Sequence, residues 1–205
     1  MENLKIFLID INDLLVKAWK KEFSNFADIH IISGSIFDSK VDALVSPANS
    51  FGIMDGGLDG KIRDRFGFQV EDNVRKIIQT NYFGELPIGI AIIAETGSSE
   101  CKYIISAPTM RTPENVSNTI NAYLAMKAIL NVALQNPKIV SVAIPGLCSL
   151  SGQMSPEMVS RQMRIAYERV VLKKYQYTHW REEKQFERFI RNEISYPPDD
   201  LERKF

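Results

Sequence analysis

Short apolar runs alternate with segments of helical periodicity along most of this 205-residue chain. The runs with strand character cover residues 5–10, 29–32, 43–45, 89–94, 103–107 and 139–144. Apolar side chains recur at helical spacing in residues 11–26, 58–66, 68–82, 113–135 and 156–172. This alternation predicts an α/β fold with three layers, in which helices cover both faces of a mainly parallel central sheet.

The last part of the chain has a different character. After residue 172, aromatic side chains precede a charged segment in which Phe186, Phe189, Ile190 and Ile194 recur at helical spacing. We therefore expect a domain at residues 1–172 and a C-terminal helical extension at residues 173–205 that packs on it. The alternative is that this extension contacts a partner or a second copy of the chain.

Charge and composition exclude several classes of protein. The chain has 25 Lys and Arg residues against 25 Asp and Glu residues, so a nucleic acid is not expected as its main partner. Two cysteines, Cys101 and Cys148, cannot build a disulfide framework or a closed zinc site, and we expect no metal and no cofactor. No apolar run is long enough to span a bilayer and the first residues lack a signal-peptide pattern, which favours a cytoplasmic protein without membrane contact.

The segment at residues 41–67 has the layout of a ligand site. An apolar run at residues 43–45 stops at Pro47, which lacks the donor that a sheet ladder needs. Asn49 and a loop with Gly52, Gly56 and Gly57 follow, before the next helical segment. Glycines ahead of a helix let the backbone approach a ligand closely and direct free N–H groups toward an anion.

Two polar side chains frame this loop, Asn49 at the end of the strand and Asp59 at the start of the helix. A carboxylate beside a loop built for anions suggests a catalytic group. The alternative is that Asp59 only caps the helix, since Asp is a favoured N-cap residue.

The motifs V-S-P-A-N-S at residues 45–50 and D-G-G-L-D-G at residues 55–60 resemble the first ligand loop of the macro domain family. The similarity extends over residues 34–167 and includes a second loop, I-P-G-L-C-S-L-S-G at residues 144–152, typical of a bacterial and phage branch. Members of this family bind ADP-ribose, and some hydrolyse ADP-ribosyl bonds. The resemblance therefore implies an ADP-ribose-type nucleotide or an ADP-ribosylated substrate as the partner.

The resemblance also implies which residues form the site. Asn49 would contact the distal ribose, and Asp59 would lie near the diphosphate and the reacting ribose. The predicted catalytic residues are Asn49 and Asp59, and the predicted ligand-binding residues are Ser35, Ile36, Asn49, Gly56, Gly57, Leu58, Pro145, Gly146, Cys148, Ser149, Leu150, Ser151 and Gly152.

Three departures from the family pattern affect these expectations. Ser35 stands where the family has an Asp that holds the adenine amino group, so the charge assistance of that hydrogen bond is lost. Cys148, Leu150 and Gln153 stand where the family has glycines, and we expect Leu150 to resist a left-handed backbone and a close phosphate. Ser46 replaces an asparagine, and we expect its hydroxyl to support the first loop.

Two functions remain in competition, with a generic nucleotide-binding protein behind them. The first is hydrolysis of an ADP-ribosyl bond, in which the carboxylate of Asp59 would stabilise an oxocarbenium-like state or orient water. The second is a binding module or sensor without turnover. Because His30 and His179 lie outside the predicted loops, a nucleophile–histidine pair at Cys148 has little support.

Overall fold

The computed structural model of the chain describes residues 4–198. Its helices and strands, in chain order, are β1 (Lys5–Asp10), α1 (Asp13–Glu22), β2 (Ile29–Ser33), the short 3-10 helix η1 (Ile36–Asp38), β3 (Ala43–Ser46), α2 (Gly57–Phe66), α3 (Phe68–Tyr82), β4 (Ile92–Glu95), β5 (Tyr103–Ser106), α4 (Asn121–Gln135), β6 (Ser141–Ile144), α5 (Pro156–Val170) and α6 (Trp180–Ile190).

The strands form one mixed sheet in the order β2-β1-β6-β3-β5-β4. Parallel pairs join β2 to β1, β1 to β6, β6 to β3 and β3 to β5, whereas the edge strand β4 runs antiparallel to β5. The prediction of a mainly parallel sheet is confirmed. Because β3 and β6 are neighbours in the sheet, the two loops expected to bind the ligand leave adjacent strand ends.

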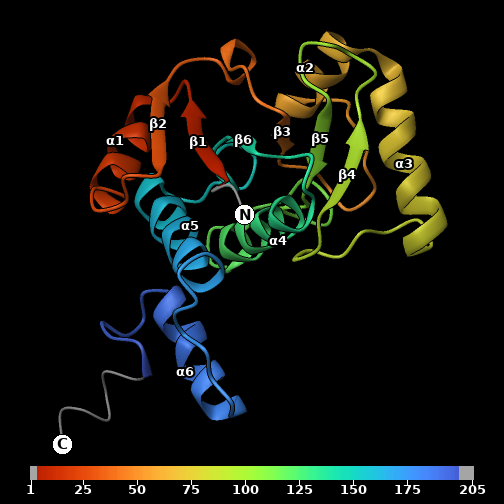
Figure 1. Cartoon of the computed structure of the whole chain (residues 1–205). Helices are drawn as coiled ribbons and strands as arrows, with labels where there is room; N and C mark the ends of the chain where they lie inside the picture. The colour runs from red at the N-terminus through yellow and green to blue at the C-terminus, as the bar shows by residue number, and fades with distance from the viewer. Residues whose placement is uncertain (1–3, 199–205) are drawn as a thin grey trace, which may run out of the picture.

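Helices cover both faces of the sheet, which confirms the three-layer architecture (Figure 1). Along β1, Ile6 and Leu8 point to one face and pack in the main apolar cluster with α1, α4 and α5. Ile9 points to the other face, in a second cluster with Ile62 of α2. Helix α3 packs mainly on the edge strand β4, where it forms a third cluster. Successive side chains of a strand point to opposite faces of the sheet, so neighbouring residues of β1 pack in different layers.

The start of α4 differs from the prediction. Thr112-Pro113-Glu114 has the pattern of a helix start, yet α4 begins at Asn121. The reason is a long-range contact, because Val116 is buried and its amide donates to the carbonyl of Gly152 at 3.0 Å. Residues 112–120 are therefore held against the loop after β6 instead of continuing the helix.

The same sequence pattern does start a helix at α5. Pro156 is its first residue, and the hydroxyl of Ser155 accepts a hydrogen bond from the amide of Met158 at 3.3 Å. Smaller differences concern strand lengths: β4 begins at Ile92 rather than residue 89, and β6 begins at Ser141 rather than residue 139.

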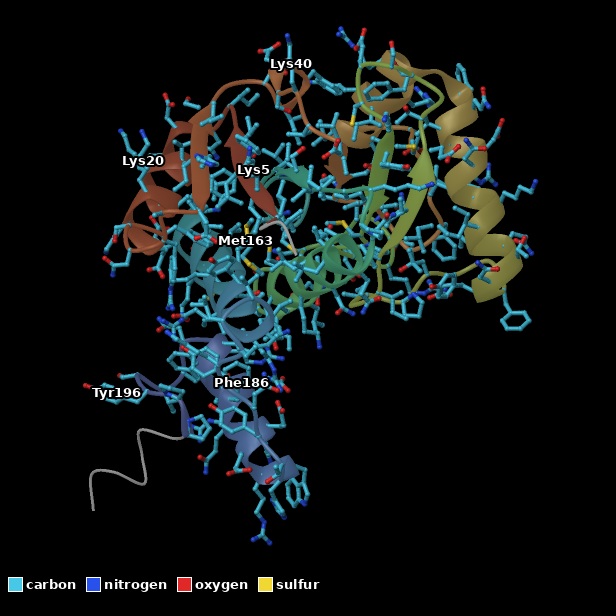
Figure 2. All side chains as sticks on the ribbon, in the orientation of Figure 1. Lys5, Lys20, Lys40, Met163, Phe186 and Tyr196 are labelled. Atoms are coloured by element: carbon cyan, nitrogen blue, oxygen red, sulfur yellow. The ribbon has the colours of Figure 1, made fainter. Side chains whose placement is uncertain are left out.

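Helix α6 projects from the body of the molecule beyond α4 and α5 (Figure 1). Its Phe186, Phe189 and Ile190 are buried in the main apolar cluster, and the ring of Phe186 lies 5.0 Å from that of Tyr175. Figure 2 shows the Phe186 side chain on this helix, with Tyr196 in the segment that follows it. The helix ends at Ile190, ahead of the prolines expected to stop it, and the domain boundary at residue 172 stays a prediction.

Between residues 4 and 198, none of the helices is both long and apolar enough to cross a membrane.

Candidate functional site

A cavity of about 230 Å³ lies at the carboxyl ends of β3 and β6. Its walls come from the loop after β3, the first turn of α2, the segment after β5 and the loop after β6. The lining residues are Asp10, Pro47, Ala48, Asn49, Ile53, Asp55, Gly56, Gly57, Leu58, Asp59, Thr109, Met110, Pro113, Pro145, Gly146, Cys148, Ser149, Leu150, Ser151 and Gly152.

The cavity brings together every predicted site residue except Ser35 and Ile36. The hydroxyl of Ser35 instead accepts a hydrogen bond from the amide of Phe37 at 3.3 Å, which caps the short helix η1. Ile36 is buried in the apolar cluster under α2. These two side chains do not line the cavity, and their roles in holding adenine stay predictions.

Asp59 is a buried carboxylate in the first turn of α2. The N-cap of this helix is Gly56 and makes no side-chain capping bond, so the alternative that Asp59 serves as the N-cap residue does not match the geometry. Its carboxylate accepts a hydrogen bond from the hydroxyl of Ser46. Only 7% of the residue is exposed.

Burial dominates the electrostatics of Asp59. Loss of hydration raises its pKa from 3.8 to about 6, the hydrogen bond from Ser46 lowers it, and the negative charges of Asp55 and Glu71 raise it further. Near neutral pH the carboxylate is still charged, but it is a better proton acceptor than an exposed aspartate.

Asn49 holds the loop that follows β3. Its Oδ1 accepts from the amides of Phe51 at 3.0 Å and Ile53 at 3.3 Å, and its Nδ2 donates to the carbonyl of Ile53 at 2.7 Å. The side chain therefore fixes the wall of the cavity at Ile53 and keeps one amide hydrogen for another acceptor.

The first turn of α2 supplies donors to the cavity. Gly56 and Gly57 line it, and Gly57 has a left-handed backbone with φ of +58° that favours glycine. The first amides of a helix have no partner within the helix, and the positive end of the helix dipole adds to their attraction for anions.

The loop after β6 closes the other side. A side chain at Gly146 is excluded because its Cβ would lie 2.4 Å from Leu15 and 2.9 Å from Asp10. The amides of Ser149, Leu150 and Ser151 have no hydrogen-bond acceptor in the described part of the protein. These amides are free to bind an anionic ligand.

The non-glycine residues of this loop take conformations that its sequence did not indicate. The left-handed positions are Cys148, with φ of +64°, and Gln153, with φ of +56°. Leu150 is not among them, and its side chain is 77% exposed. The loop therefore keeps its left-handed positions without glycine there, and Leu150 points largely to solvent.

Asp10 lines the cavity and was missed by the sequence analysis. It ends β1, and its carboxylate accepts from the amides of Asn12 and Gly146, both at 2.9 Å. The only sequence signal was a polar residue at the carboxyl end of a predicted parallel strand, which is where ligands gather in such sheets.

Cys148 has the geometry of a structural thiol. Burial raises the pKa of the thiol to about 12, and its Sγ faces the carbonyl of Thr109 at 3.8 Å. Neither His30 nor His179 lines the cavity. Within residues 4–198 there is also no group of three or more His, Cys, Asp or Glu side chains that could hold a metal ion.

Comparison with known proteins assigns the fold and the family. The family sequence model described as Macro domain matches residues 45–163, which is more than half of the chain. An uncharacterized protein of Aquifex aeolicus is 32% identical over 136 residues, which are 66% of this chain and 78% of that protein.

Two solved structures share the fold. The macrodomain of Mycobacterium tuberculosis DarG has a TM-score of 0.58 and 24% identity, over 67% of this chain and 88% of that one. Thermosipho africanus DarTG in complex with ADP-ribose has a TM-score of 0.55 and 19% identity, over 75% of this chain and 46% of that one. These likenesses show the shared fold, and the match of the family model shows that the chain belongs to the macro domain family.

Proposed function

We propose that this protein binds ADP-ribose or a closely related nucleotide and hydrolyses an ADP-ribosyl bond. Membership of the macro domain family and the ADP-ribose complex of a protein with the same fold support the choice of ligand. The single observation that carries the catalytic part is Asp59, a buried carboxylate with a raised pKa that lines the cavity in the first turn of α2.

The diphosphate would lie between the two loops. On one side are the first-turn amides of α2 at Gly57 and Leu58, and on the other are the amides of the loop after β6. Backbone N–H groups on both sides suit a ligand with two linked phosphates, because each phosphate can be contacted without a basic side chain.

The reaction would then proceed at the ribose beside Asp59. As the bond from the anomeric carbon to the leaving group breaks, its electron pair departs with the leaving group and positive charge develops on the ribose. The Asp59 carboxylate stabilises this charge and accepts a proton from the water whose oxygen bonds to the anomeric carbon. The remaining amide hydrogen of Asn49 is available to hold a ribose hydroxyl.

A binding module without turnover is the second candidate. It is favoured by the hydrogen bonds of Asn49, whose carboxamide is already committed to the loop at Phe51 and Ile53. A side chain used in this way fixes the shape of the cavity and contributes less to the orientation of a substrate.

Titration calorimetry with ADP-ribose, combined with a turnover assay on a mono-ADP-ribosylated protein, separates these functions. We expect a micromolar dissociation constant, about −8 kcal/mol. The Asp59→Asn variant should keep binding and lose turnover. Binding without turnover in the unmodified protein would select the module, and no binding of ADP-ribose would reject both functions.

A further inference from the structure

The loop after β6, called here the second ligand loop, is supported by a segment of which only Pro113 lines the cavity. Residues 112–120, called here the buttress segment, precede α4. The amide of Val116 donates to the carbonyl of Gly152 at 3.0 Å. If residue 152 carried a Cβ, this atom would lie only 2.8 Å from the Cγ2 of Val116. The loop and the buttress segment are therefore interlocked at Gly152.

A second contact lies one residue further along the loop. The Nδ2 of Asn115 donates to the Oε1 of Gln153 at 3.1 Å. Gln153 has one of the two left-handed non-glycine conformations of this loop, and each such conformation costs about 1–2 kcal/mol. A backbone of this kind persists only where its surroundings hold it, and the buttress segment provides part of that support.

The buttress segment is in turn fixed by two helices. From α5, the buried Gln162 donates through Nε2 to the carbonyl of Thr119 at 2.8 Å. From the end of α6, Arg191 donates through Nη1 to the carbonyl of Asn118. The hydroxyl of Thr119 donates to the carbonyl of Val116 at 2.7 Å, which joins these anchors to the residue that contacts the ligand loop.

Helix α6 is firmly attached at this end. The Cζ of Arg161 lies 4.5 Å from the centre of the Phe189 ring, and its guanidinium donates to the carbonyl of Phe189 at 2.8 Å. Phe189 and Ile190 are buried. The position of Arg191 is thus set by the packing of α6 on α5, and α6 lies beyond the residues that match the family model.

We propose that α6 sets the conformation of the second ligand loop through the buttress segment, with Arg191 and Asn115 as positioning residues. Loss of either contact would lower the fraction of molecules whose loop has the ligand-competent conformation. The apparent affinity would fall in proportion to that fraction. The part of the inference that concerns affinity rests on the proposed function. The part that concerns the loop itself does not.

The test compares Arg191→Ala with Arg188→Ala. Arg188 is a matched control on the same helix, because its ion pair with Glu193 is exposed on both sides and makes no contact with the buttress segment. We expect Arg191→Ala to raise hydrogen exchange at the amides of Val116 and Gln153, which donate to the carbonyls of Gly152 and Leu150, and to weaken ADP-ribose binding about two- to tenfold. Arg188→Ala should change neither quantity.

Asn115→Ala provides a second, independent entry into the same network. This variant should also raise hydrogen exchange and weaken binding. In the double variant with Arg191→Ala, the fold loss of affinity should be smaller than the product of the two single fold losses, because both substitutions act on one loop. Losses of binding free energy that add fully in the double variant would contradict the coupling of the two residues through one loop.

The outcomes separate the inference from the proposed function. Equal exchange at the amides of Val116 and Gln153 in the Arg191→Ala and Arg188→Ala proteins would overturn the inference, whatever the ligand. Raised exchange in Arg191→Ala, in a protein that does not bind ADP-ribose at all, would support the inference and reject the proposed function. Equal melting temperatures of the two variants would exclude a general loss of stability as the cause.

Discussion

The hydroxyl of Ser46 donates a hydrogen bond to the carboxylate of Asp59, and both side chains are buried at the end of β3. Ser46 stands where the family pattern has an asparagine, and it was expected only to support the loop. In the structure it contacts the proposed catalytic carboxylate directly. It therefore influences both the orientation and the proton affinity of Asp59.

We predict that Ser46→Ala shifts the acidic limb of the pH–rate profile to higher pH. The hydrogen bond from Ser46 lowers the pKa of Asp59, so its loss raises this pKa further above 6. A larger fraction of Asp59 would then be protonated at neutral pH, and turnover there would fall. The measurement is turnover between pH 5 and 9, and an unmoved acidic limb would show that Asp59 is not the titrating group.

We predict that Asp59→Asn stabilises the protein at neutral pH while it abolishes turnover. The pKa of Asp59 is raised from 3.8 to about 6 in the folded protein, so the folded state holds this proton more tightly than the unfolded state does. Stability from this group is therefore full below pH 4 and falls as the pH rises to 6. The loss amounts to about 3 kcal/mol at most.

The asparagine side chain cannot ionise, so the variant escapes this loss. Urea unfolding should show Asp59→Asn to be more stable by about 1–3 kcal/mol at pH 7.5, with the difference shrinking toward pH 4. A variant less stable than the unmodified protein at pH 7.5 would contradict the burial penalty assigned to Asp59.

Cys148→Ser should leave turnover within about twofold of the unmodified protein. Burial raises the pKa of the Cys148 thiol to about 12, so almost no thiolate is present at neutral pH. Serine keeps the size of the side chain and its Cβ at a position where φ is +64°. Steady-state kinetics provide the check, and a loss of several orders of magnitude would make Cys148 a nucleophile after all.

We predict that the C-terminal helix contributes strongly to global stability. Phe186 is 1% exposed and packs among aromatic rings of the extension, so Phe186→Ala should lower the free energy of unfolding by about 3–5 kcal/mol. Phe83→Ala is the matched control, because that ring is 95% exposed and should change stability by about 0.5 kcal/mol or less. Similar losses in the two variants would mean that α6 does not share the core.

The sequence predicted α3 and β1 with their observed bounds, because α3 has a clear helical period and β1 is a continuous apolar run between Lys5 and Asp10. The prediction of helix starts was wrong at one of two segments that share the same pattern. Ser155-Pro156-Glu157 starts α5, whereas Thr112-Pro113-Glu114 starts no helix. The difference lies in the contact of Val116 with Gly152, and local propensity carries no information about such a partner.

The residues of the candidate site also differ in whether the sequence could predict their arrangement. Asn49, Asp59 and the glycines between them lie in one segment, so their arrangement could be predicted from residues 49–59 alone. Asp10 lies 136 positions from the Gly146 amide that it accepts from, and no local pattern joins the two. The hydrogen bonds of Asn49 within its own loop were also unforeseen, because they depend on the turn at Phe51 and Ile53.

The burial of Cys101 and Cys148 has a practical consequence, since these are the only cysteines of the chain. Neither thiol is accessible to a maleimide dye while the protein stays folded. A Ser151→Cys variant would place one reactive thiol on the exposed part of the second loop. A fluorophore attached there would test the proposed binding directly, because a nucleotide that enters the cavity would change the surroundings of the dye.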